Sequence, residues 1–89
     1  MLTKIDVEQI AKNYFIQNDY PIVGSGNVKF PEDRTEPEAI EHFKKINTAT
    51  VSFRSKYLDN SDPRYLLDPG VYIAYVNLIT GEVDVPPHL

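Results

Sequence analysis

The apolar residues near the amino terminus recur at the spacing of one face of an α-helix, and this pattern constrains the fold more than any other. They stand at positions i, i+3, i+4, i+7 and i+8, and they are Val7, Ile10, Ala11, Tyr14 and Phe15. Asp6 precedes this stripe as a predicted N-cap, and Gln9 completes a capping-box pattern. The helix is expected to end near Tyr20, because a residue that precedes a proline avoids the helical conformation.

The spacing of apolar residues changes from helical to alternating at Thr48. Residues 49–56 alternate between a buried type and a polar type, which predicts a strand with one buried face. Residues 71–77 are rich in β-branched and aromatic side chains and apolar on both faces, which predicts a central strand. Residues 82–85 form a last short strand. Together they predict a three-stranded antiparallel meander beneath the N-terminal helix.

The segment between the helix and the meander has a weaker pattern. Residues 21–23 and 28–30 are short extended candidates around a predicted turn at residues 24–27, and they form either a hairpin or an irregular sheet edge. Residues 37–45 predict a second short helix that begins with a proline. The fold expected for residues 1–89 is a single α+β domain. An N-terminal amphipathic helix packs on an antiparallel sheet of three to five strands, with a second short helix.

Composition excludes several classes of protein. The 89 residues contain no cysteine, which excludes disulfides, a thiolate nucleophile and cysteine-based metal sites. The net charge of −4 lacks the basic surplus that nucleic-acid binding needs. The chain has no secretory signal and no apolar run near the roughly 20 residues that span a bilayer. These features predict a cytoplasmic protein that binds neither nucleic acid nor membrane.

Residues suited to acid–base or nucleophilic chemistry are few and poorly placed. His42 stands beside Glu38 and Glu41 on the predicted second helix, where the group is either a metal or acid–base site or a solvated helix face. His88 is the penultimate residue. No serine lies in a Gly-x-Ser-x-Gly elbow, and residues 24–26 lack the other parts of a phosphate loop. The sequence therefore predicts a non-catalytic domain with no cofactor and no metal.

Two polar clusters are candidate partner-binding surfaces. The first is an acidic segment, interrupted among charged residues only by Arg34, and its members are Glu32, Asp33, Glu36, Glu38 and Glu41. The second lies at the end of the strand from Thr48 and in the loop that follows, and its members are Tyr57, Asp59, Asp62 and Tyr65. Acidic groups attract a basic partner, and exposed tyrosines are enriched at interfaces. Helix-dipole compensation and solubility are the more common explanation of such acidic residues, and packing is the more common explanation of such tyrosines, so both interpretations stay open.

The C-terminal half resembles a family of small bacterial proteins. Besides the N-terminal helix, the resemblance is carried by residues 51–58, a polar loop with Asp62, the turn at residues 68–70 and the segment 77–83. These features resemble the immunity proteins of polymorphic-toxin systems, which share a PepSY-like or cystatin-like helix-on-sheet plan. The chain departs from that pattern at Asn77, where an aspartate is usual, and it lacks a tryptophan at Val51. Residues 20–46 have no counterpart in the family.

The resemblance implies an immunity or inhibitor protein that neutralises a cognate bacterial toxin or effector by covering its active site. The expected partner is a basic protein, and the expected state of the free chain is a monomer or a homodimer. The alternative is a small structural or regulatory module that homodimerises or joins a larger assembly. An enzyme that uses Glu38, Glu41 and His42 is a third hypothesis.

Overall fold

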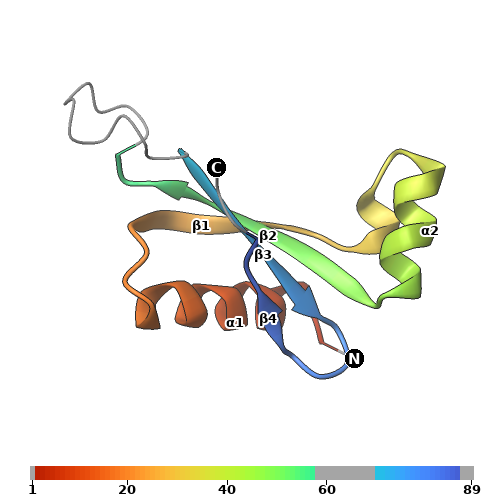
Figure 1. Cartoon of the computed structure of the whole chain (residues 1–89), viewed down its shortest axis with the longest axis horizontal. Coiled ribbons are helices and arrows are strands. Elements are labelled where there is room, and N and C mark those ends of the chain that lie inside the picture. The colour runs from red at the N-terminus through yellow and green to blue at the C-terminus, as the bar shows by residue number, and fades with distance from the viewer. Residues whose placement is uncertain (1, 58–69, 87–89) are drawn as a thin grey trace.

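Four strands form one antiparallel sheet, and a long helix lies along one of its faces (Figure 1). The computed structural model describes residues 2–57 and 70–86. Its elements in chain order are α1 (Lys4–Gln17), β1 (Ile22–Lys29), the 3-10 helix η1 (Pro31–Asp33), α2 (Pro37–Lys45), β2 (Thr48–Ser55), β3 (Val71–Asn77) and β4 (Val83–Asp84). The strand order in the sheet is β1-β2-β3-β4. This arrangement confirms the predicted α+β fold.

The core lies between α1 and the sheet. Three residues of the predicted helical stripe, Val7, Ala11 and Phe15, are fully buried. They pack against alternate residues of the two central strands, which are Ala49, Val51 and Phe53 of β2 and Ala74 and Val76 of β3. The Phe15 and Phe53 rings meet edge to face with centroids 5.7 Å apart, a favourable geometry for two aromatic rings. The apolar residues that recur at helical spacing in α1 and those that alternate in β2 and β3 therefore form one core.

The N-cap of α1 is Thr3, so the prediction of Asp6 at this position is wrong by one turn. The Asp6 backbone amide donates to the Thr3 hydroxyl at 3.2 Å, and the Thr3 amide donates to the Asp6 carboxylate at 3.1 Å. This reciprocal pair satisfies two backbone donors at once, which explains why the helix begins at Lys4. Hydrogen bonding of the Asp6 carboxylate to the Thr3 backbone amide, and next to the Thr3 side chain, holds the pKa of Asp6 below its ordinary value of 3.8.

β1 is one strand with a bulge, and the turn predicted at residues 24–27 is wrong. Val23 pairs with Arg54 and Asn27 pairs with Ser52, so β1 advances four residues while β2 advances two. Gly24 takes a φ of +77°, which L side chains rarely adopt. The Gly26 amide donates to the Glu8 carboxylate of α1 at 3.2 Å. Gly24 and Gly26 therefore belong to an irregular edge strand, which was one of the two predicted alternatives.

The turn after β3 is organised by the side chain of Asn77. Its Oδ1 accepts hydrogen bonds from the Ile79 amide at 2.8 Å and from the Thr80 amide at 2.9 Å. Gly81 follows with a φ of +78° and returns the chain to β4. An aspartate oxygen would accept the same two bonds, so the asparagine at this position leaves the turn intact.

α2 matches its predicted bounds but stands at one end of the sheet, far from most of α1 (Figure 1). None of its residues is buried, whereas α1 buries three. Its inner side rests on η1 and on the start of β2. No helix within residues 2–57 and 70–86 has the length and apolar character needed to cross a membrane.

Candidate functional site

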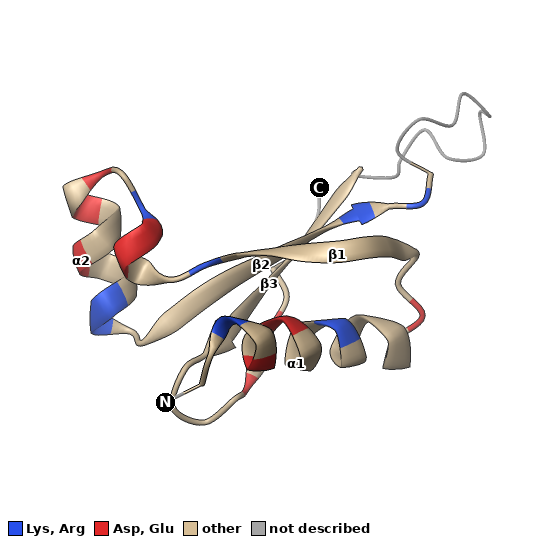
Figure 2. Cartoon of the chain, turned by 180° about the vertical axis from the view of Figure 1, so that it is seen from behind, with Lys and Arg blue, Asp and Glu red and all other residues tan. Residues whose placement is uncertain are grey.

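The predicted acidic surface lies on η1 and α2, at one end of the sheet (Figure 2). All its members are exposed, and they are Glu32, Asp33, Glu36, Glu38 and Glu41. Asp33 is used within the fold, because its carboxylate pairs with Lys4 Nζ at 2.8 Å and accepts from the Phe30 amide at 2.9 Å. These two interactions hold the pKa of Asp33 below its ordinary value of 3.8. The other four carboxylates form no ion pair within the described residues, which leaves them accessible to a partner.

Of the second predicted cluster, the structure describes Tyr57, which lies at the opposite end of β2 from α2. Tyr57 is half-buried just beyond this strand, and Lys56 Nζ lies 5.1 Å from the centroid of its ring. The other three members, Asp59, Asp62 and Tyr65, fall outside the described residues. An eight-residue strand spans roughly 25 Å, so Tyr57 is separated from α2 by the length of β2. The structure therefore does not bring Tyr57 together with the acidic surface on η1 and α2.

The face of the sheet opposite α1, here called the open face, runs between these two ends. Strand pairing defines its central rows as Val23, Arg54 and Val71; Asn27, Ser52 and Ile73; and Lys29, Thr50 and Tyr75. Three of its apolar side chains are substantially exposed: Val23 at 51%, Val71 at 39% and Ile73 at 38%. Neighbouring exposed apolar side chains on one face are typical of an interaction surface.

The exposure of Val71 and Ile73 refines the prediction for residues 71–77. β3 is a central strand, as expected from its composition. Only its side toward α1 is fully packed, where Ala74 and Val76 are buried. The sequence signal for the open face was therefore present in the apolar residues on the second side of this strand.

Phe43 of α2 and Arg34, which follows η1, cover one half of the open face. The Arg34 guanidinium donates from Nη2 to the Thr50 hydroxyl at 2.6 Å and lies 4.3 Å from the centroid of the Phe43 ring. Phe43 also contacts Tyr75, with ring centroids 6.2 Å apart. Thr48 and Thr50 are consequently buried although they point away from α1. From the sequence, Arg34 was only an interruption in an acidic segment, whereas the structure places it over the sheet.

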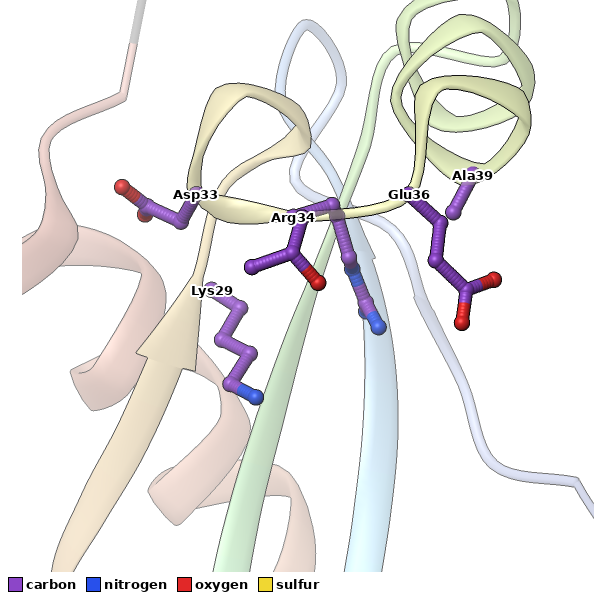
Figure 3. Close-up of a pocket in the computed structure, with 6 residues that line it drawn as sticks. Lys29, Asp33, Arg34, Glu36 and Ala39 are labelled. Carbon is purple, nitrogen blue, oxygen red and sulfur yellow. The ribbon is translucent and has the colours of Figure 1, made fainter.

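Two shallow hollows adjoin Arg34, with volumes of about 210 and 220 Å³. The first lies between η1 and α2 and is lined in part by Glu36 (Figure 3). The second lies on the open face and is lined in part by Ile73 and Tyr75. Lys29 and Arg34 line both hollows, and Figure 3 shows their side chains extending in the same direction along the sheet. Lys29 and Arg34 thus lie at the border between the two hollows.

The residues predicted for acid–base chemistry lie on the outer part of α2. His42 is exposed, and its ring meets the Phe43 ring at 5.3 Å between centroids. Within the described ranges, no hydrogen bond joins His42 to Glu38 or Glu41. No group of three or more His, Cys, Asp or Glu side chains in these ranges is placed to hold a metal ion. The described surface offers apolar contact, charge and hydrogen bonding.

The chain has no match among protein-family models, curated proteins or solved structures. The similarity to toxin-immunity proteins therefore stays a prediction that rests on the residues of the C-terminal half. The structure adds the open face, which lies between α2 at one end and Tyr57 at the other.

Proposed function

We propose that this chain is a non-catalytic, cytoplasmic protein-binding domain that acts as an immunity or inhibitor protein. In this proposal it neutralises a toxin or effector by covering the active site of that protein. The observation that carries the proposal is the open face, where Val71 and Ile73 are exposed next to each other on β3 and Val23 is exposed on β1, with Arg54 between Val23 and Val71. Burial of apolar surface is the main favourable term in most protein associations.

The size of the open face indicates that its two ends take part in binding. The three longer strands, β1 to β3, are about 4.8 Å apart and roughly 25 Å long, so they present a projected area on the order of 350 Å². A stable complex buries about 800 Å² on each partner. A partner that docks on the open face must therefore also contact α2, the end near Tyr57, or both.

The acidic side chains of α2 suit the approach of a basic partner. Glu36, Glu38 and Glu41 are exposed, and Glu38 and Glu41 are three residues apart on one side of the helix. Exposed charges of this kind accelerate association and exclude wrong partners more than they add affinity. The proposal thus assigns affinity to the open face and steering to α2.

The experiment is titration of a purified toxin, encoded beside the gene for this chain, with the purified protein. Toxin activity is expected to fall to zero at a one-to-one ratio. The variant Ile73→Asp places a charge in the open face and is expected to weaken inhibition strongly. Ile79→Asp is the matched control, because Ile79 is 70% exposed in the turn after β3. Full toxin activity at saturating protein would refute the proposal.

The alternative function is a structural module that pairs with a second copy through the same open face. It is favoured by the same exposed side chains, since a two-fold axis would place Val71 and Ile73 of both copies together. Light scattering across a range of concentrations separates the two functions. A stable dimer that Ile73→Asp dissociates would support the alternative.

A further inference from the structure

Lys29 and Arg34 are cations that the described part of the chain does not neutralise. Lys29 is exposed on the open face, and neither side chain pairs with a carboxylate within residues 2–57 and 70–86. Asp33, the nearest acidic neighbour in sequence, is already paired with Lys4. An unneutralised pair of cations that lines a hollow is complementary to an anionic group from outside.

Arg34 is held in one position by its surroundings. Thr50 accepts one of its hydrogen bonds, and the guanidinium stacks over the Phe43 ring. Its Nε is buried and has no hydrogen-bond partner among the described groups. A guanidinium that is already fixed loses little side-chain entropy when it binds a carboxylate, and arginine is well suited to that task.

The hollow on the open face is the better place for such an anion. The other hollow includes Glu36, whose charge would repel a carboxylate (Figure 3). The hollow on the open face adds apolar contacts from Ile73 and Tyr75. The Arg34 guanidinium contacts Thr50 of β2, and Ile73 is the diagonal neighbour of Thr50 on β3, about 7–8 Å away. Residues i and i+2 of an extended peptide are about 7 Å apart, so they match this distance.

We propose that this hollow binds an extended acidic segment of the partner protein, in which an Asp or Glu stands two residues from an apolar side chain. The carboxylate pairs with Lys29 and Arg34, and the apolar side chain rests on Ile73 and Tyr75. The inference rests on the proposed protein-binding function and adds the chemistry of the recognised segment. The partner therefore presents a basic surface to α2 and an acidic segment to the hollow.

The test uses a capped pentapeptide that has glutamate and phenylalanine two residues apart, flanked by threonines, and a copy with glutamine in place of glutamate. Amide and arginine Nε signals of the labelled protein are followed by NMR during titration. The glutamate peptide is expected to shift signals of Lys29, Arg34, Ile73 and Tyr75, and the glutamine copy is expected to bind at least about tenfold more weakly. Added salt is expected to reduce the difference.

Two variants and one control identify the cations. Arg34→Gln is expected to weaken binding of the glutamate peptide by roughly ten- to a hundredfold, and Lys29→Gln by roughly two- to fivefold. Lys29 is exposed, so its substitution tests the inference even if Arg34→Gln disturbs α2. Lys12→Gln, on α1 and across the sheet, is expected to bind as the wild type does.

Three results would overturn the inference: equal binding of the two peptides, equal affinities of the Lys29 and Lys12 variants, or shifts located elsewhere. Shifts of the same signals with protein concentration alone would assign the hollow to a second copy and would also overturn it. The toxin titration separates this inference from the proposed function. If the wild type, Lys29→Gln and Arg34→Gln all inhibit the toxin equally, binding of an acidic segment is rejected and the inhibitor function is retained. If the protein binds the peptide but does not inhibit the toxin, the immunity function is rejected and the binding of an acidic segment in the hollow is retained.

Discussion

The two faces of one sheet differ in what their side chains contact. On the face toward α1, Val51, Ala74 and Val76 have no exposed surface. On the open face, residues of the same strands include Val71 and Ile73, each more than a third exposed. The difference shows that the covered face supplies stability, whereas the open face retains apolar surface that a stable monomer does not need.

The two helices repeat this difference. α1 packs along the sheet with three fully buried residues, and α2 rests on one end of the open face with none. α2 contacts the open face through the stack of Phe43 with Arg34 and Tyr75. A helix with so little burial is expected to open locally at a lower free energy than the core does.

The largest effect is expected from removing a ring on the covered face. Phe15→Ala should lower the free energy of unfolding by about 3–5 kcal/mol, because it leaves a cavity against Phe53. Chemical denaturation measures the loss. Ile16→Ala is the control, since Ile16 is 58% exposed on the same helix and should change stability by less than about 0.5 kcal/mol. Similar losses for both would contradict the assigned core.

A smaller loss is expected where β1 approaches the covered face. A Cβ atom at Gly26 would lie 2.8 Å from the side chains of Phe53 and Val51. Gly26→Ala should therefore reduce stability by about 1–3 kcal/mol through overpacking. The neighbouring Ser25 is exposed, and Ser25→Ala should be nearly neutral in the same denaturation experiment. A neutral Gly26→Ala would show that β1 can move away from β2.

The attachment of α2 is tested by Phe43→Ala. The substitution removes the stack with Arg34 and the contact with Tyr75, and should lower global stability by about 1–2 kcal/mol. Hydrogen exchange should accelerate at amides of α2 much more than at amides of α1. Equal acceleration in both helices would mean that α2 is part of the same cooperative unit as the core.

Acid should weaken the contacts at the start of α1. The folded-state pKa values of Asp6 and Asp33 lie below the ordinary 3.8, through Thr3 and through Lys4 with Phe30. Their stabilising contribution is therefore present above pH 3.8 and is lost as the pH falls through the folded-state values. Unfolding midpoints measured between pH 6 and pH 2 should show this loss. In Asp33→Asn, the unfolding midpoint should fall less steeply below pH 3.8 than in the wild type. An equally steep fall would show that the Asp33–Lys4 pair does not contribute to the loss of stability in acid.

The smallest effect on stability is expected on the open face. Ile73→Thr should change the free energy of unfolding by less than about 0.5 kcal/mol. Val76→Thr, on the covered face of the same strand, should cost about 1–3 kcal/mol because it buries a hydroxyl. A large loss for Ile73→Thr in denaturation would mean that the open face is packed in the free protein.

Local patterns in the sequence predicted most of the elements. The bounds of α2 followed from Pro37 and the lysines at its end, and the start of β2 followed from the change of period at Thr48. The prediction failed where two local signals competed. Thr3 and Asp6 both suit an N-cap, and only their reciprocal hydrogen bonds decide between them. Gly24 to Asn27 has the chemistry of a turn, and only the pairing with β2 makes it a bulge.

The candidate site was harder to predict than the fold, because it depends on contacts distant in sequence. Nothing local indicates that Arg34 reaches Thr50, or that α2 covers only half of the open face. The apolar residues on the second side of β3 indicated burial, whereas Val71 and Ile73 are more than a third exposed. Partner-binding roles for the acidic side chains stay predictions.

The bulge in β1 has a consequence for how copies of this chain avoid one another. β1 is an edge strand of the described sheet, and a regular edge offers its amides to any other strand. Here the positive φ of Gly24 breaks the regular edge, and the Glu8 carboxylate occupies the Gly26 amide. Strand-by-strand growth into fibrils is thereby blocked at this edge. The chain can therefore expose apolar side chains on one face while this edge disfavours pairing with another strand.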